Sequence, residues 1–73
     1  MNRSKFNAEM AENKDTQATL SAAMGISLSR LNAKINERDG AEFTQNELAF
    51  FKARWSLSNE RFAAIFFSNE VSK

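Results

Sequence analysis

The stretch Thr16–Asn36 reads TQATLSAAMGISLSRLNAKIN, and the rest of the chain is organised around it. It contains no Asp and no Glu, although the 73-residue chain has nine of them. Thr16 and Ser27 are favoured helix N-cap residues, and Gly25 separates the two segments that they open. The stretch therefore predicts two short helices joined by a tight glycine turn, without acidic residues, as in a helix-turn-helix that faces a polyanion.

The remainder of the chain also predicts helices. It has no Pro, only two Gly, and no sustained period-two pattern of a β-strand. Five helices are expected: about Lys5–Asn13 after the N-cap Ser4, Thr16 to about Met24, Ser27 to about Asn36, one from the capping box Thr44-Gln45-Asn46-Glu47, and one from Ser58. The polar segment Glu37–Glu42 is expected to be a loop. The tail Ser68–Lys73 is predicted either to fray or to pair as a short extended arm.

Apolar side chains at helical spacing predict one small core. The residues expected to face inward include Phe6, Met10, Leu20, Met24, Leu31, Ile35, Phe43, Leu48, Phe51, Trp55, Phe62, Ile65 and Phe66. Phe50 and Phe67 lie off these stripes, and an exposed Phe in a small domain indicates a partner surface. Together with Val71 of the tail, they form the predicted dimer or partner surface.

The composition argues against catalysis. The chain has no His, no Cys and no Tyr, so the commonest metal ligand, the commonest general base and the thiolate nucleophile are missing. Paired carboxylates at Glu9/Glu12 and Glu37/Asp39 are expected on exposed helix faces or in a loop, where nothing shifts their pKa. We therefore expect a protein that is not an enzyme and needs no cofactor, metal or small-molecule substrate.

The hydropathy pattern gives an expected location. No apolar run approaches the ~18 residues of a membrane span. The first residues, MNRSKFNAEM, lack the apolar segment of a signal peptide. These patterns predict a cytoplasmic protein without a membrane partner.

The second helix of the acid-free stretch presents a polar face. Leu31 and Ile35 mark its buried stripe, while Leu28, Ser29, Asn32, Ala33 and Asn36 share an arc about 140° wide on the other side. Arg30 and Lys34 project beside this arc, and Arg38 follows, so all three are predicted phosphate contacts. Leu28 either covers the helix crossing or contacts a thymine methyl group. The net charge of +1 is lower than is usual for a DNA-binding domain.

A family resemblance adds to this reading. The residues that carry it are Gln17, Ser21, Gly25-Ile26 and Leu31, then FTQNEL at 43–48 and the pair Phe66-Phe67. The pattern resembles the helix-turn-helix of lambda-repressor and Cro-like phage regulators, over roughly Phe6 to Phe67. It implies a compact five-helix bundle of that type, with one DNA-binding domain at 1–73 and its helix-turn-helix at 16–36.

The resemblance also implies site residues. Ser27, Leu28, Ser29, Asn32 and Ala33 would occupy base-facing positions. Asn36 would contact phosphate, and Gln17 would either contact phosphate or brace the second helix. Backbone N–H groups at the helix that Thr16 opens would add an anion site.

The implied function is that of a transcriptional regulator. It would bind a palindromic double-stranded DNA operator as a homodimer in a bacterial host cell, and would be nucleoid-associated when bound. The alternative is an antirepressor or modulator that pairs with another regulator protein through exposed Phe residues.

Overall fold

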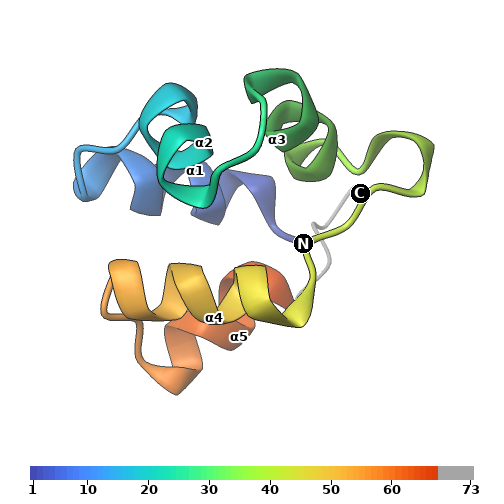
Figure 1. Ribbon diagram of the computed structural model, residues 1–73. Coiled ribbons are helices and arrows are strands. Elements are labelled where there is room, and N and C mark those ends of the chain that lie inside the picture. Colours follow the sequence, from blue (N-terminus) through green and yellow to red (C-terminus); the bar gives the residue numbers. More distant parts are fainter. Residues whose placement is uncertain (68–73) are drawn as a thin grey trace.

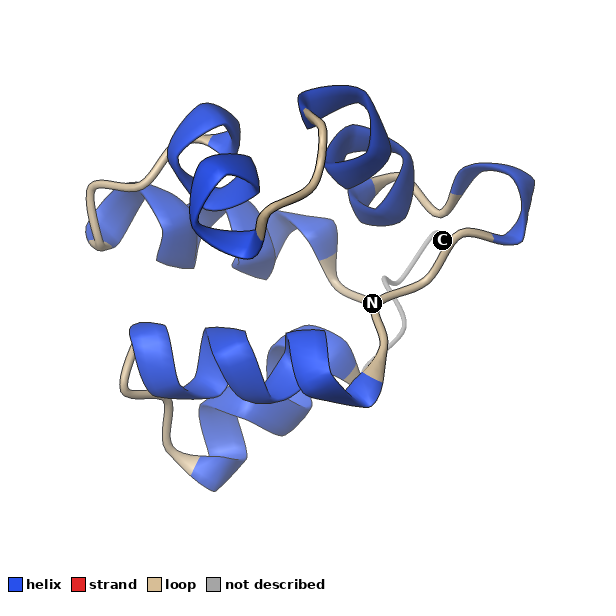
Figure 2. Cartoon of the chain, viewed as in Figure 1, coloured by secondary structure: helices blue, strands red, loops and turns tan. Residues whose placement is uncertain are grey.

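The computed structural model describes residues 1–67, which form five α-helices, one 3-10 helix and no strand (Figures 1 and 2). These elements are α1 (Arg3–Glu12), α2 (Gln17–Met24), α3 (Leu28–Ile35), η1 (Arg38–Gly40), α4 (Gln45–Arg54) and α5 (Asn59–Phe66). In Figure 1, α1, α2 and α3 form one layer, and α4 and α5 lie below it. The predicted all-α class is confirmed for these residues. Val71 and the predicted arm lie outside them.

Local capping signals place most helix starts where the sequence predicts them. The Ser27 hydroxyl accepts a hydrogen bond from the Arg30 N–H at 3.0 Å. Thr44 and Glu47 form the predicted capping box, in which Glu47 Oε1 accepts from Thr44 N–H at 2.9 Å and Thr44 Oγ1 accepts from Glu47 N–H at 3.2 Å. Each bond satisfies an N–H that the helix itself leaves unpaired.

The prediction for the first helix was wrong at its start. Asn2, not Ser4, is the N-cap, and its side chain accepts from the Lys5 N–H at 3.0 Å. The Asn2 N–H in turn donates to the Ile65 carbonyl at 2.7 Å, so the cap is fixed to α5 by a contact distant in sequence. The helix ends at Glu12, because Lys14 adopts a left-handed φ of 60° and the N–H groups of Lys14 and Asp15 turn back to the carbonyls of Ala11 and Met10, at 3.0 Å and 2.9 Å.

Phe6 lies at the centre of the core, where α1 meets α4 and α5. Its fully buried ring contacts the rings of Phe51 and Trp55, each at 5.3 Å between centroids, and that of Phe66 at 6.1 Å. The other buried apolar residues are Leu20, Leu31, Ile35, Leu57 and Ile65. The upper and lower layers therefore share one aromatic core.

Two expectations about exposure were wrong. Phe50 is half-buried rather than exposed, because its ring packs at 5.2 Å from that of Phe51 and the Arg54 guanidinium covers it at 5.6 Å. Glu9 is buried at 8% exposure, because Asn13 and Arg61 both donate hydrogen bonds to its carboxylate. Phe67, in contrast, is 68% exposed, as its position off the core stripe predicts.

A buried carboxylate ties the two layers together. Asp15, between α1 and α2, accepts bonds from Arg54 Nε at 2.9 Å and Arg54 Nη2 at 2.8 Å. It also accepts from Trp55 Nε1 at 2.7 Å and Thr19 Oγ1 at 2.9 Å. The hydrogen bonds from Arg54, Trp55 and Thr19 outweigh the effect of burial and hold the pKa of Asp15 far below its usual range.

Candidate nucleic-acid interface

A tight turn at Gly25 joins α2 to α3 (Figure 2). Gly25 has φ 73°, in the left-handed region that costs glycine little. The Ile26 N–H donates to the Ser21 carbonyl at 3.1 Å, and the Gly25 N–H donates to the Ala22 carbonyl at 3.3 Å. These two bonds make a Schellman motif, so α2 ends abruptly and α3 begins within three residues.

The inner face of α3 is firmly attached. Leu31 is fully buried and Ile35 is 3% exposed. Ser21 is buried on α2, which packs directly against α3, and its hydroxyl donates to the Ala18 carbonyl at 3.1 Å. A small side chain with its polar group satisfied suits this close contact between helices. The apolar stripe thus fixes which face of α3 is turned outward.

The outer face of α3 begins with exposed residues. Ser27, Leu28, Ser29 and Arg30 are exposed, and Leu28 retains 50% of its surface. Half of the Leu28 side chain is therefore open to solvent and accessible to a partner. Ala33, one turn further on, is half-buried.

Lys34 is the clearest correction among the predicted site residues. It is 5% exposed, and its ammonium pairs with Glu47 Oε1 at 2.8 Å and donates to the Glu42 carbonyl at 3.3 Å. Burial raises the pKa of Glu47, but the hydrogen bonds from Lys34 and Thr44 leave it below its usual value. Lys34 therefore holds α3 against α4 and is not placed for a phosphate contact.

Asn32 lies at the centre of a polar network on α3. Its Nδ2 donates to Gln17 Oε1 of α2 at 3.2 Å. Its Oδ1 accepts from Arg38 Nη2 of η1 at 2.6 Å and from Asn36 Nδ2 at 3.3 Å. Gln17 therefore braces α3, one of the two roles predicted for it.

The network continues to the start of α1. Asn36 Oδ1 accepts from Arg3 Nη1 at 3.2 Å, across 33 positions of sequence. Glu37, the next residue, accepts from the amino group of Met1 at 3.0 Å. Arg3 was not among the predicted site residues, and no local pattern could identify it, because only the fold brings α1 to the end of α3.

The remaining predicted anion contact is Thr16. It is exposed, and it forms a capping box with Thr19, whose Oγ1 accepts from the Thr16 N–H at 2.9 Å. The Thr16 hydroxyl accepts from the Thr19 N–H at 3.1 Å. Two of the polar groups at this helix start are thus already bonded within the protein.

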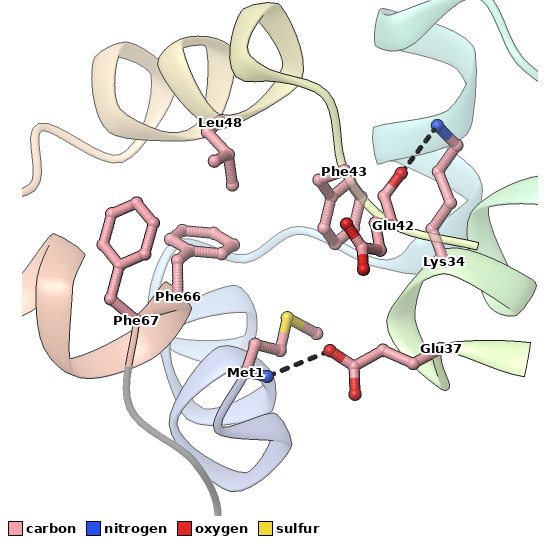
Figure 3. Close-up of a pocket in the computed structure, with 8 residues that line it drawn as sticks. All are labelled: Met1, Lys34, Glu37, Glu42, Phe43, Leu48, Phe66 and Phe67. Atoms are coloured by element: carbon pink, nitrogen blue, oxygen red, sulfur yellow. Dashed lines mark hydrogen bonds and ion pairs between the residues drawn. The ribbon is translucent and has the colours of Figure 1, made fainter. Parts of the chain in front are cut away.

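A pocket of about 290 Å³ lies behind α3 (Figure 3). Phe43, Leu48 and Phe66 form its apolar side. On its polar side, Lys34 and Glu37 are both ion-paired. Lys34 pairs with Glu47, and Glu37 pairs with the Met1 amine, as the dashed line in Figure 3 shows. The exposed residues at the start of α3 do not line this pocket.

Residues 1–67 hold no group of three or more His, Cys, Asp or Glu side chains placed to bind a metal ion. None of their helices is both long and apolar enough to cross a membrane. Comparison with protein-family models, curated proteins and solved structures finds no match to the chain.

Proposed function

We propose that the protein binds double-stranded DNA through α2 and α3, which act as a helix-turn-helix of the lambda-repressor type. In this arrangement α2 crosses the phosphate backbone and α3 enters the major groove, whose width of about 12 Å admits one helix. One observation carries the proposal: α3 has a buried inner face and an exposed outer face, within a stretch that contains no carboxylate.

The charges around α3 favour a polyanion. Arg30 is exposed on the helix, and the hydrogen bonds of Asn32 and Asn36 bring Arg38 and Arg3 to its far end. Because the bonded partner of Arg38 is the neutral amide of Asn32, this contact does not cancel the charge of its guanidinium. Most of the binding energy would come from such phosphate contacts, and it would fall steeply with salt.

Selectivity would rest on the first turn of α3. Leu28 presents an apolar surface suited to a thymine methyl group, and the Ser29 hydroxyl can bond several base edges. Ser27 is exposed too, but its hydroxyl already caps α3. We therefore assign base reading chiefly to Leu28 and Ser29.

Binding can be tested by fluorescence anisotropy with a pool of random 20-base-pair duplexes, at low and at moderate salt. Arg30→Gln should weaken binding and reduce the salt slope by about 0.9. Arg61→Gln, on α5, removes the same charge from a side chain that is 60% exposed, and it should leave binding unchanged. Absence of wild-type binding at low salt would refute the proposal.

We further propose that the protein acts as a dimer on a palindromic operator, with its two α3 helices about 34 Å apart. The surface for the second copy is the exposed Phe67 with Phe62, whose rings lie 5.6 Å apart, beside an apolar groove that includes Leu48 and Ala49. Sedimentation with operator-length duplex should show two protomers per duplex. A strict monomer, alone and on DNA, would refute the dimer.

The second candidate function is a protein-binding modulator of another regulator. It is favoured by the same exposed Phe67 and by the low net charge of +1. The two functions differ in one measurement, because a modulator of this kind would bind no duplex at low salt.

A further inference from the structure

Both ends of the Asn32 side-chain amide are hydrogen-bonded within the protein. Its amide nitrogen donates to Gln17 on one side, and its carbonyl oxygen accepts from Arg38 on the other, at 3.2 Å and 2.6 Å. An Asn that reads adenine needs both groups for the base, one to donate to N7 and one to accept from N6. The oxygen also accepts a second bond, from Asn36, so bidentate base reading by Asn32 would require one of the two bonds to its oxygen to break.

The two partners of Asn32 lie on opposite sides of α3. Gln17 is the first residue of α2, and Arg38 lies in η1, which follows α3 (Figure 1). Gln17 is half-buried and Arg38 is exposed. Because both bond to the single amide of Asn32, their polar groups nevertheless lie close together beside α3 and are placed for the phosphate backbone of a groove that this helix enters.

The backbone on both sides of Arg38 is constrained. Glu37 and Asp39, its two neighbours, both have φ 53°, which L-residues rarely adopt. This constrained loop sets where the Arg38 side chain begins, and the bond to Asn32 sets where its guanidinium ends. Without that bond, the long side chain would keep many rotamers and would lose more entropy on binding phosphate.

We propose that Asn32 is a positioning residue, which holds Gln17 and Arg38 in place for backbone phosphates and does not read a base. This inference rests on the proposed DNA binding, and it changes the role of Asn32 from base reading to positioning. Asn32 sets affinity for every sequence alike, and sequence preference resides in Leu28 and Ser29.

The test compares two duplexes, one selected by the wild-type protein from a random pool and one with the same bases scrambled. Asn32→Ala should weaken binding to both by the same factor, within about twofold. It should also reduce the salt slope by about 0.9, because Arg38 loses its fixed position. Ser29→Ala, a matched control on the same helix, should instead reduce the preference for the selected duplex.

A double-mutant cycle checks the route of the effect. If Asn32 acts through Arg38, then Asn32→Ala added to Arg38→Ala should cost much less than it does alone. A readout without DNA is the side-chain relaxation of Arg38 Nε by NMR, which should show greater mobility in Asn32→Ala. Gln17→Ala breaks the bond on the other side, and it should likewise weaken both duplexes equally.

The possible results distinguish failure of this inference from failure of the proposed DNA binding. If Asn32→Ala lowers the preference for the selected duplex by about fivefold or more, the size of a direct base contact, then Asn32 reads a base and the inference is wrong. An unchanged Arg38 mobility would also overturn it. If the wild-type protein binds neither duplex, the proposed function itself fails.

Discussion

Replacing Asp15 with Asn should destabilise the fold sharply, although the side chain changes by one atom. The Asp15 carboxylate is 8% exposed and accepts bonds from Thr19, Trp55 and twice from Arg54. An amide offers one accepting oxygen, and its NH₂ group would face donors. Asp15→Asn therefore removes the charge and leaves donors on Arg54 or Trp55 without an acceptor.

The size of this loss follows from the number of bonds. A hydrogen bond to a charged group contributes roughly 1.5–3 kcal/mol, and solvent screens part of the contribution on the exposed side. Asp15→Asn should therefore cost about 2–3 kcal/mol. For a 73-residue chain the whole stability is roughly 4–11 kcal/mol, so the Tm should fall by roughly 10–20 °C.

The cost should also depend on pH. The pKa of Asp15 is lowered in the folded state, while in the unfolded chain it returns to about 3.9. The stabilisation is therefore complete above pH ~5, and it is lost as the pH falls below ~4 toward the folded-state pKa, because the unfolded chain takes up the proton first. Wild type and Asp15→Asn should converge in stability at low pH.

Trp55 supplies the assay, because it is the only Trp in the chain and donates directly to Asp15. Urea unfolding followed by Trp55 emission at pH 7, 5, 4 and 3 gives the free energy of unfolding for each variant. Asp39→Asn, in the exposed loop, makes the same chemical change and should cost little. The reasoning is refuted if Asp15→Asn costs less than about 0.5 kcal/mol at pH 7, or if its cost is the same at pH 3.

Four further substitutions test other parts of the structure. Gly25→Ala should cost about 1–2 kcal/mol in chemical unfolding, because a Cβ there meets no neighbour but strains φ 73°; a stabilised variant would contradict this. Glu47→Ala should lower the free energy of unfolding by about 3 kcal/mol, because it leaves the buried Lys34 without its ion-pair partner. Lys34→Met should lower it by less, and should leave the salt slope of DNA binding unchanged. A smaller slope in Lys34→Met would show that Lys34 contacts phosphate. Phe67→Ser should leave the Tm within about 2 °C of wild type and abolish any dimer in sedimentation, and a persisting dimer would locate it elsewhere.

Local signals explain what the sequence predicted well. The helix starts at Ser27 and Thr44 depend on side chains within three residues, and Gly25 ends α2 through its own backbone. The buried stripe of Leu31 and Ile35 could also be predicted, because it depends only on spacing within one helix. Such features require no knowledge of the partner elements.

Contacts distant in sequence explain what was missed. Lys34 and Glu47 are 13 positions apart, and neither shows in the sequence which partner it has. A Lys beside a polar helical arc predicts an exposed charge, since Lys is seldom buried unless it is paired. Glu9 was misjudged for the same reason, because its bonding partner Arg61 lies on α5.

The positions of the ion pairs Lys34–Glu47 and Asp15–Arg54 have a consequence for the register of α4. Its apolar stripe, Leu48, Phe51 and Trp55, repeats at helical spacing, so a slide by one turn would still offer apolar side chains to the core. Glu47 is bonded to Lys34 near one end of the helix, and Arg54 to Asp15 at the other. A slide of about 5.4 Å would break both ion pairs and leave charges buried. The two ion pairs thus select one alignment of α4 among several that hydrophobic packing alone would tolerate.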